Sequence, residues 1–405
     1  MSFRTSLSGM NAANADLGVT ANNIANVNTT GFKQSRAEFG DVFAVSTYGL
    51  SQNAIGAGVR LLNVAQQFAQ GSVEFTDRNL DLAISGQGFF TLSDNGATTY
   101  TRAGNFQADK DGYVVTPTGQ RLQAFPPNAQ GGFDAARMGD LRLSTDDSAP
   151  RTTDLVTVGT NLPANADAPS VAPFDPTDAN TFNEARSLTV YDSLGVAHIQ
   201  TLYYVKTDTA NEWQIYTTID DQQVGGATTL SYSDSGALVE PADGRIVLPA
   251  YTPTNGAGAL NLTLDVGAST QFGEKFALNE LRQNGYGAGR LISIDVGQDG
   301  VVFARYTNGA ANPIGQVAMT TFANPQGLQQ LGDNMWAETS ESGIARRGAA
   351  GTSDIGLIQS GALEASNVDL TEQLVNMITA QRNFQANAQM VSTQDQITQT
   401  VINIR

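Results

Sequence analysis

The stretch "LGVTANNIANVNTTGFKQ", residues 17–34, has the apolar spacing of an amphipathic helix but an unusual polar face. Leu17, Ala21 and Ile24 recur at helical intervals, and the positions between them are mostly Asn and Thr. The water-facing side of a helix usually carries Lys and Glu, which favour helix formation more than Asn does. The amide face therefore predicts a helix that packs against identical helices or lines a wet channel. Gly31, after "NTT", marks its expected end.

The same helical period covers both ends of the chain. At the N-terminus the spacing alternates between four and three residues from Phe3 to Asn28, with amide interruptions at Asn14 and Asn28. At the C-terminus "SNVDLTEQ" contains helix-capping signals, pairing Ser366 with Asp369 or Asp369 with Glu372. Neither Gly nor Pro interrupts residues 370–405, so a helix of ~54 Å is expected. Its heptad spacing slips by one three-residue step at Gln394.

Two sets of side chains follow from this period, and both point to a self-assembling homopolymer. Amides carry a donor and an acceptor, so they can hydrogen-bond to copies of themselves, whereas a charge is repelled by its own copy on a neighbour. We define the apolar seam, expected to drive assembly, as Phe3, Leu7, Met10, Leu17, Ala21, Ile24, Leu370, Leu374, Met377, Phe384, Val391, Ile397, Val401 and Ile404. The amide set, expected to pack between helices or line a channel, is Asn22, Asn23, Asn26, Asn376, Gln385 and Asn387.

Length and composition exclude several classes of protein. A chain of 405 residues predicts two to four domains. It has no cysteine, which excludes disulfides, thiol catalysis and thiolate metal sites. No stretch approaches the ~18 apolar residues of a membrane span, so no membrane insertion is expected. The N-terminus lacks the features of a cleavable secretory signal, so any export is expected to use another route.

The negative charge is concentrated in the middle of the chain. The net charge of −17 argues against a nucleic-acid partner, since phosphate binding requires clustered Lys and Arg. Residues 145–284 hold 18 acidic and 6 basic residues, a net charge of −12, while residues 1–144 are nearly neutral. This contrast predicts a separately solvated section whose copies repel one another.

The interior of the chain reads as strands and turns. Residues 106–119 and 292–309 are two similar hairpins with Asp-Gly at the turn, and they flank the acidic section. We therefore expect one β-domain interrupted by an insert at 145–284, which has strand-like runs of its own. The predicted fold class is mixed and mainly β, with one β-rich domain inserted into another and long terminal α-helices forming a coiled-coil-like domain.

Candidate catalytic and metal-binding motifs all have a simpler structural interpretation. Adjacent carboxylates, such as Asp146 with Asp147 or Asp220 with Asp221, lie in turns and are expected to be solvated. His198 is the only histidine and is expected to be an ordinary strand side chain. "ADKDGYV" lacks the final Glu of a calcium loop and fits a hairpin turn. "GYGAGR" is not a dinucleotide fingerprint. We predict no enzyme activity, no catalytic residue, no cofactor and no metal site.

Four groups of motifs resemble the bacterial flagellar rod and hook proteins. "SLSGMNAANADLGVTANNIANVNTTGFKQSRAEF" (6–39) is similar to their N-terminal signature. "ISGQGFFTL" (84–92) with "YTRAGNFQADKDGYVV" (100–115) resembles their β-domain. "GLQQLGDNMWAETSESG" (327–343) and "GALEASNVDLTEQLVNMITAQRNFQANAQM" (361–390) resemble their C-terminal region. Rod proteins generally lack a large insert, so the chain is more similar to the members that form the hook.

The resemblance implies a curved, flexible tube that links rod to filament and transmits motor torque as a universal joint. It implies four domains: a terminal helical domain forming the inner tube (1–30 plus 365–405), a connecting segment (31–70 plus 325–364), a β-domain (71–144 plus 285–324) and an outer inserted β-domain (145–284). Implied partners are many copies of the chain itself, the distal rod protein, the hook-cap protein, the hook–filament junction protein and the flagellar type III export machinery. The implied location is extracellular, in the hook and basal body.

Two alternative functions remain at this stage. A distal-rod protein of the same family would form a straight, rigid polymer. A β-rich extracellular adhesin would account for the insert but would leave both terminal helices unexplained.

Overall fold

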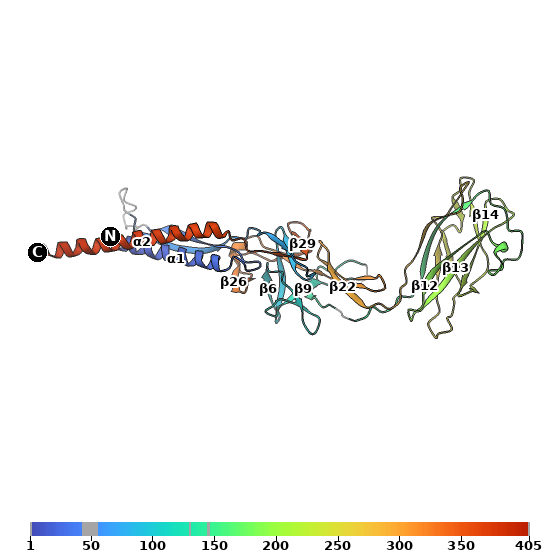
Figure 1. The fold of residues 1–405 in the computed structure, drawn as a ribbon, viewed down its shortest axis with the longest axis horizontal. Helices are drawn as coiled ribbons and strands as arrows, with labels where there is room; N and C mark the ends of the chain where they lie inside the picture. Colours follow the sequence, from blue (N-terminus) through green and yellow to red (C-terminus); the bar gives the residue numbers. More distant parts are fainter. Residues whose placement is uncertain (1, 43–55, 129–130, 144–145, 404–405) are drawn as a thin grey trace. The chain divides into compact units, whose positions relative to one another are not determined.

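The computed structural model describes residues 2–42, 56–128, 131–143 and 146–403 (Figure 1). The chain divides into two compact units. Unit 1 comprises Met1–Ser144, Ile294–Ala304 and Asn312–Arg405, and unit 2 comprises Thr145–Ser293 and Arg305–Ala311. The second unit thus extends past residue 284 and takes in a short return segment of the chain.

Unit 1 contains two long helices, α1 (Ser2–Ala25) and α2 (Leu370–Asn403), which lie side by side (Figure 1). The side chain of Asp369 begins α2, because its Oδ1 accepts the backbone N–H groups of Thr371 and Glu372, at 2.8 and 3.1 Å. After α1, the chain turns at Gly31, whose φ of +69° suits glycine. A Cβ there would lie 2.5 Å from the backbone nitrogen of Ala103. The prediction of a mainly β chain with a helix at each end is confirmed.

A hairpin of β1 (Ser35–Asp41) and β2 (Val59–Gln66) follows α1 and packs on it. The strands are antiparallel, with Ser35 opposite Gln66 and a bulge between Glu38 and Phe39. The Nδ2 and Oδ1 atoms of Asn23 bond the backbone oxygen and nitrogen of Ser35, at 2.8 and 2.9 Å. These two bonds fix the start of the hairpin against the last turn of α1.

The main sheet of unit 1 runs in the order β22-β23-β24-β9-β5-β6-β27-β26, and the unit boundaries after residues 293, 304 and 311 fall within β22, β23 and β24. Its core contains Leu82, Phe90, Phe106, Leu122 and Val317. The strands of this region are β3 (Val73–Phe75), β4 (Leu82–Ser85), β5 (Phe89–Asp94), β6 (Ala97–Thr101), β7 (Gln107–Ala108), β8 (Val114–Val115), β9 (Arg121–Phe125), β10 (Gly139–Asp140), β22 (Leu291–Val296), β23 (Val301–Tyr306), β24 (Ala311–Val317), β25 (Met319–Thr321), β26 (Gln329–Gly332), β27 (Met335–Ala337), β28 (Arg346–Gly348), β29 (Leu357–Ser360) and β30 (Ala362–Glu364).

Both hairpins expected from the Asp-Gly turns are present. β7 pairs with β8 across a turn in which Asp109 Oδ1 accepts the N–H groups of Asp111 and Tyr113. β22 and β23 are neighbours in the sheet, and Gly300 has a φ of +80° at their turn. The Asp side chain and the left-handed Gly thus have the roles in the turn that the sequence predicts.

Unit 2 consists of two packed sheets. One runs β12-β13-β14-β16-β17; the other runs β18-β19-β11-β20, with β21 beside β11. Trp213, Leu202, Leu230 and Leu264 are fully buried in the core between them. The strands are β11 (Leu155–Pro163), β12 (Glu184–Tyr191), β13 (Ala197–Lys206), β14 (Glu212–Ile219), β15 (Gln222–Gln223), β16 (Thr228–Tyr232), β17 (Leu238–Glu240), β18 (Arg245–Val247), β19 (Thr263–Asp265), β20 (Thr270–Phe272) and β21 (Ala277–Gln283), and two short 3-10 helices, Ala179–Thr181 here and Pro325–Gly327 in unit 1, complete the described elements.

Candidate self-assembly surface

The two helices pack through small and polar side chains. In α1, Ser6, Ala13 and Thr20 are buried at seven-residue intervals, and in α2 Gln373 and Ala380 are buried seven residues apart. We define the polar stripe as these residues together with Gly9, Asn23 and Asn387. A Cβ on Gly9 would lie 2.5 Å from Asn387 Oδ1, so the Asn387 side chain packs directly on Gly9. Small side chains permit close packing of the two helices.

The contacts define an antiparallel pair with an overhang. Asn23 Nδ2 donates to Gln373 Oε1 at 3.2 Å near one end of the pair, and Gly9 meets Asn387 near the other. The beginning of α1 therefore lies beside the C-terminal half of α2. The last residues of α2 extend beyond the first residue of α1. Figure 1 shows α2 continuing past the beginning of α1. Residues of α2 beyond about 394 consequently have no described helix beside them.

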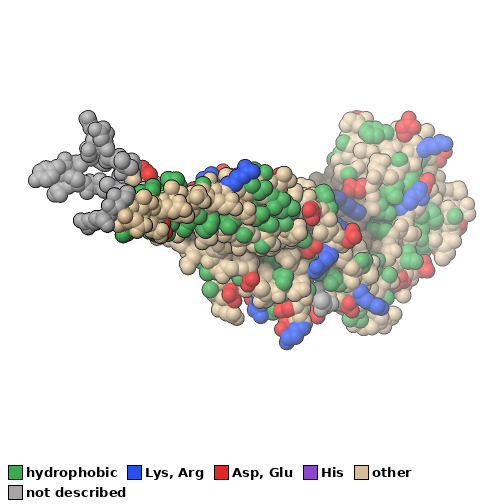
Figure 2. Space-filling view, turned by 60° about the vertical axis from the view of Figure 1, so that its left-hand side comes forward, with side chains coloured by type: hydrophobic (Ala, Val, Ile, Leu, Met, Phe, Trp, Pro, Cys, Tyr) green, Lys and Arg blue, Asp and Glu red, His purple; other side chains and the backbone are tan. Residues whose placement is uncertain are grey.

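Much of the apolar seam is left exposed by this pairing. Leu374 retains 40% of its accessible surface, Ile397 51% and Val401 64%. Phe3, Leu7, Ala21, Leu370 and Phe384 are also exposed, whereas Met10, Leu17, Ile24, Met377 and Val391 are half-buried. Ile404 lies outside the described residues. Figure 2 shows hydrophobic side chains along the helical part of the molecule with few charges among them. Monomeric proteins seldom leave a long apolar surface exposed.

The amide set is divided among three environments. Asn23 is buried and Asn387 half-buried, and both lie in the chain's own helix pair. Asn26 closes the turn after α1, because its Nδ2 donates to the carbonyl of Asn22 at 2.9 Å and its Oδ1 accepts from Thr29 at 3.1 Å. The side chains of Asn22, Asn376 and Gln385 are exposed. Only this exposed part is free to meet a neighbouring molecule.

A buried ionic cluster joins the ends of the helices to the β-domain of unit 1. Glu364 Oε1 accepts from Lys33 Nζ at 2.6 Å and from the backbone N–H of Gly71 at 2.9 Å. Its Oε2 accepts from Arg102 Nη1 at 3.3 Å. Lys33 also donates to the carbonyl of Ala69 at 2.8 Å. Four segments distant in sequence are therefore held together by one carboxylate.

The three charged side chains of this cluster are almost inaccessible to water. Lys33 is 1% exposed and Glu364 is 0% exposed. In the sequence, Lys33 lies two residues after Gly31. Burial lowers the pKa of Lys33 and of Arg102, while the nearby Glu364 acts in the opposite direction on both. No sequence motif predicted this cluster. The available signal was that each of the three residues lies in one of the family-like motifs.

Unit 2 contains a second charged cluster, centred on the single histidine. His198 on β13 is buried, with Nδ1 2.6 Å from Asp220 Oδ2 and Nε2 3.2 Å from Asp192 Oδ2. Burial by itself lowers the pKa of His198, but the hydrogen bonds to both carboxylates raise it above the ordinary value. His198 is thus more than the ordinary strand side chain expected from the sequence, because it ties two turns together.

Asp192 and Asp220 are held by several further donors. Asp192 accepts N–H groups from Leu194 and Val196, each at 2.8 Å, and an amide bond from Asn255. Burial raises the pKa of Asp192, but these bonds and His198 outweigh burial and lower the pKa to about 2. Asp220 accepts the backbone N–H of Ile199 at 3.0 Å. Both carboxylates therefore use hydrogen-bonding capacity within the fold.

The described residues show no other chemical centre. Among them, no group of three His, Asp or Glu side chains is arranged to hold a metal ion. Neither described helix is long and apolar enough to cross a bilayer. The features that stand out are the exposed apolar seam and the packing that presents it.

Four family models match the chain in order along its length. They are described as flagella basal body rod protein (residues 3–33), flagellar hook protein FlgE/F/G D1 domain (83–172), flagellar basal body protein FlaE D2 domain (161–286) and flagellar basal body rod FlgEFG protein C-terminal (359–404). The two terminal models cover most of α1 and α2, and the D2 model lies within unit 2. The matches therefore cover the elements that form the candidate assembly surface.

Full-length relatives and a solved structure agree with these matches. The chain is 40% identical over 417 residues to the flagellar hook protein FlgE of Escherichia coli K12, with 100% of both chains covered. It is 33% identical over 445 residues to flagellar hook protein FlgE of Borreliella burgdorferi, covering 100% of this chain and 99% of the relative. The crystal structure of Helicobacter pylori flagellar hook protein FlgE2 matches 72% of this chain and 100% of its own, with a TM-score of 0.52 and 14% identity, which supports the fold.

The four family models, which match both terminal helices and the two β-rich regions, place the chain among the flagellar rod and hook proteins. Within that class the identity over the whole length is decisive. The chain belongs to the flagellar hook protein FlgE family, a family of structural proteins.

Proposed function

We propose that this chain is the structural subunit of a flagellar hook and assembles with its own copies into a tube. The observation that carries the proposal is the exposed apolar seam on both helices, including the overhang of α2. Burying such a surface stabilises an assembly by ~25 cal/mol for each Å² removed from water. One helix of a neighbouring copy laid on the overhang would cover Ile397 and Val401 and leave its own seam for the next copy. A contact between unlike faces repeats in this way without limit and builds a helical polymer.

In this assembly the terminal helices form the inner tube. The segments 31–70 and 325–364 connect the tube to the β-domain, and the acidic insert faces outward. The exposed amides Asn22, Asn376 and Gln385 then lie against neighbouring helices or the channel. The insert, with its net charge of −12, makes weak and wet contacts that allow spacing to change as the tube bends. This is the behaviour needed in a universal joint that transmits motor torque from rod to filament.

Family membership supports the remaining parts of the proposal. The hook lies outside the cell, and its subunits leave through the flagellar type III export machinery without a cleavable signal. The polymer grows from the distal rod protein beneath a hook-cap protein, and hook–filament junction proteins bind its finished end. The chain has no catalytic task, consistent with the internal bonding of Asp192, Asp220 and His198.

Electron microscopy of the purified full-length protein tests this function. We expect short curved tubes above a critical concentration, measured by light scattering. The matched control is the chain lacking residues 370–405, which should remain a folded β-rich monomer by circular dichroism. Straight rigid tubes would support the distal-rod alternative, and a chain that remains monomeric at every concentration would contradict self-assembly.

A further inference from the structure

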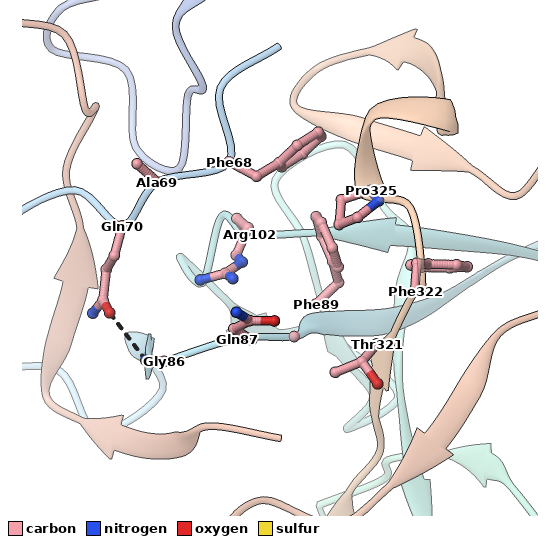
Figure 3. A pocket seen from close by; sticks show the side chains of 11 residues that line it. Phe68, Ala69, Gln70, Gly86, Gln87, Phe89, Arg102, Thr321, Phe322 and Pro325 are labelled. Carbon is pink, nitrogen blue, oxygen red and sulfur yellow. Dashed lines mark hydrogen bonds between the residues drawn. The ribbon is translucent and has the colours of Figure 1, made fainter. Parts of the chain in front are cut away.

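A pocket of about 300 Å³ lies in unit 1 beside the ionic cluster (Figure 3). Its wall includes three aromatic rings, those of Phe68, Phe89 and Phe322, together with Arg102, Gln87 and Thr321. Phe68 and Phe89 meet edge to face with centroids 5.5 Å apart, and Phe89 and Phe322 meet similarly at 6.0 Å. The pocket is therefore built from rigid, mutually packed side chains around one cation.

Arg102 has unused hydrogen-bonding capacity at this pocket. It is only 3% exposed, its Nη1 donates to Glu364, and its guanidinium carbon lies 5.3 Å from the centroid of the Phe89 ring. Its buried Nε has no hydrogen-bond partner. Buried arginines normally use several of their five donors, since an unpaired donor away from water costs free energy.

The charges around Arg102 do not balance. Lys33 and Arg102 are two cations, and Glu364 is the one carboxylate that both contact. Both oxygens of Glu364 are already used, Oε1 by Lys33 and Gly71 and Oε2 by Arg102. The cluster therefore has a net charge of +1 in a place where an unpaired charge is costly. A second carboxylate at the pocket would balance the excess.

We propose that the pocket receives an Asp or Glu side chain from a second copy of this chain, whose carboxylate pairs with Arg102. The inference rests on the proposed self-assembly and assigns one of its contacts. The chain is a rich source of such groups, with 39 acidic residues against 22 basic ones. The aromatic wall excludes water around the pair, and the guanidinium fork suits a carboxylate. The contact gives the polymer a specific point of attachment on the β-domain in addition to the apolar helix seam.

An isosteric pair of substitutions at Gln87 tests the proposal. The Gln87 side chain is exposed at the pocket wall, and the residue's fixed contact is its backbone oxygen, which accepts from Gly356 at 2.7 Å. Gln87→Glu supplies an internal carboxylate for Arg102, so the monomer should melt at the same temperature or higher. Its critical concentration for polymerisation should rise about ten-fold. Gln87→Met has similar size without the charge and should polymerise like the wild type.

Other results of this comparison would overturn the inference. If both variants polymerise like the wild type, the pocket takes no carboxylate although self-assembly stands. If both are impaired, the contact depends on the Gln87 side chain itself. If only Gln87→Met is impaired, a negative charge at this position does not weaken assembly. That result would contradict the pairing of Arg102 with a neighbour's carboxylate. A wild-type chain that does not polymerise would instead contradict the proposed function, so the two failures are distinguishable.

A cysteine at the same position gives an independent measurement that does not depend on stability. The chain contains no natural cysteine, so Gln87→Cys has a unique thiol. Its labelling rate should fall about ten-fold or more on polymerisation, because the neighbour's side chain closes the pocket. A photo-crosslinker on this thiol should join a peptide of a second copy. Changing the acidic residue at that crosslink to its amide should impair assembly as Gln87→Glu does. Equal rates of thiol labelling in monomer and polymer would refute the contact.

Discussion

The side-chain amide of Asn23 in α1 donates a hydrogen bond to Gln373 in α2, 3.2 Å away and almost completely removed from water. Leu374, the next residue of α2, points elsewhere and keeps 40% of its surface exposed. The chain thus uses polar and small side chains to hold its own helices together. Many of its apolar seam side chains remain exposed on the monomer.

The close approach at Gly9 predicts that bulk there separates the helices. Gly9→Leu places a side chain where even a Cβ would lie 2.5 Å from Asn387, so amides of α1 should exchange with solvent faster. Gly18 is the matched control on the same helix, because a Cβ there meets nothing within 4 Å. Gly18→Leu should protect the helix slightly, by about 0.8 kcal/mol of helix propensity. Equal hydrogen exchange in both variants would show that the close approach is unimportant.

A charge on the apolar seam should abolish assembly without unfolding unit 1. Leu374→Asp puts an unpaired carboxylate on a surface that the polymer buries, which costs several kcal/mol once water is excluded. We expect no tubes by electron microscopy, and a melting temperature of the β-domain within a few degrees of the wild type. Leu374→Met keeps the apolar volume and should still form tubes. Tubes formed by the Asp variant would remove Leu374 from the assembly surface.

Loss of the central carboxylate of the ionic cluster should destabilise unit 1. Glu364→Gln leaves Lys33 and Arg102 buried without their counter-charge, and breaking a buried pair in this way costs about 3–5 kcal/mol. Denaturant unfolding followed by circular dichroism measures the loss. Glu38→Gln removes an exposed partner of Arg36 and should leave stability almost unchanged. A similar small effect at both sites would mean that the cluster does not hold the segments together.

The stability of unit 2 should depend on pH through His198 and Asp192. The folded pKa of His198 is raised, so its contribution is fully present below the unfolded pKa of about 6.5 and is lost as pH rises through the folded value. The folded pKa of Asp192 is lowered to about 2, so its contribution is present above about 4 and is lost as pH falls toward 2. Unit 2 should therefore be most stable between these limits.

Tryptophan fluorescence can follow this pH dependence in unit 2 alone. The chain has two tryptophans, and Trp213 lies in the core of unit 2 while Trp336 lies in unit 1. A Trp336→Phe background leaves Trp213 as the reporter in thermal melts at a series of pH values. His198→Asn should remove the loss above neutral pH and leave the acid limb in place. An unchanged alkaline limb in that variant would assign the effect to another group.

The acidic insert, residues 145–284, should control the curvature of the tube more than its formation. Ser148 and Gly289 are joined by two backbone hydrogen bonds, at 2.7 and 3.2 Å, so a short glycine link can replace residues 149–288. The shortened protein should form straighter tubes, because the mutually repelling surface is gone. In the wild type, salt should reduce this repulsion, since the Debye length is ~10 Å at 0.1 M. Wild-type curvature after the deletion, or no tubes at all, would contradict this division of roles.

The strand and helix pattern was accessible from the sequence because it depends on local periods. The three- and four-residue apolar spacing predicted α1 and α2, and Asp-Gly pairs predicted the hairpins at Gly112 and Gly300. These signals act over a few neighbouring residues, where helix capping and turn geometry decide the conformation. The motif resemblance added the family, which the full-length relatives confirm.

What the helices bury was decided by tertiary structure. An apolar period identifies a face but not its partner, and in this fold Ser6, Ala13 and Thr20 meet the other helix while much of the seam stays exposed. The same small residues repeat every seven positions, so their spacing was visible, but only the pairing shows which face lies inside. The physical reason is that the tight packing at Gly9 and the buried hydrogen bonds of Asn23 favour contact between the two helices of one chain through the polar stripe.

By itself the sequence determined the class of fold, the terminal helices, the acidic insert and the family. The tertiary structure alone decided that Lys33, Arg102 and Glu364 form one buried cluster and that His198 lies between Asp192 and Asp220. Lys33 and Glu364 are 331 residues apart in sequence, and no local period links such positions. Their contact arises because burial leaves each charge with no water to solvate it, so the folded chain must bring a partner to it.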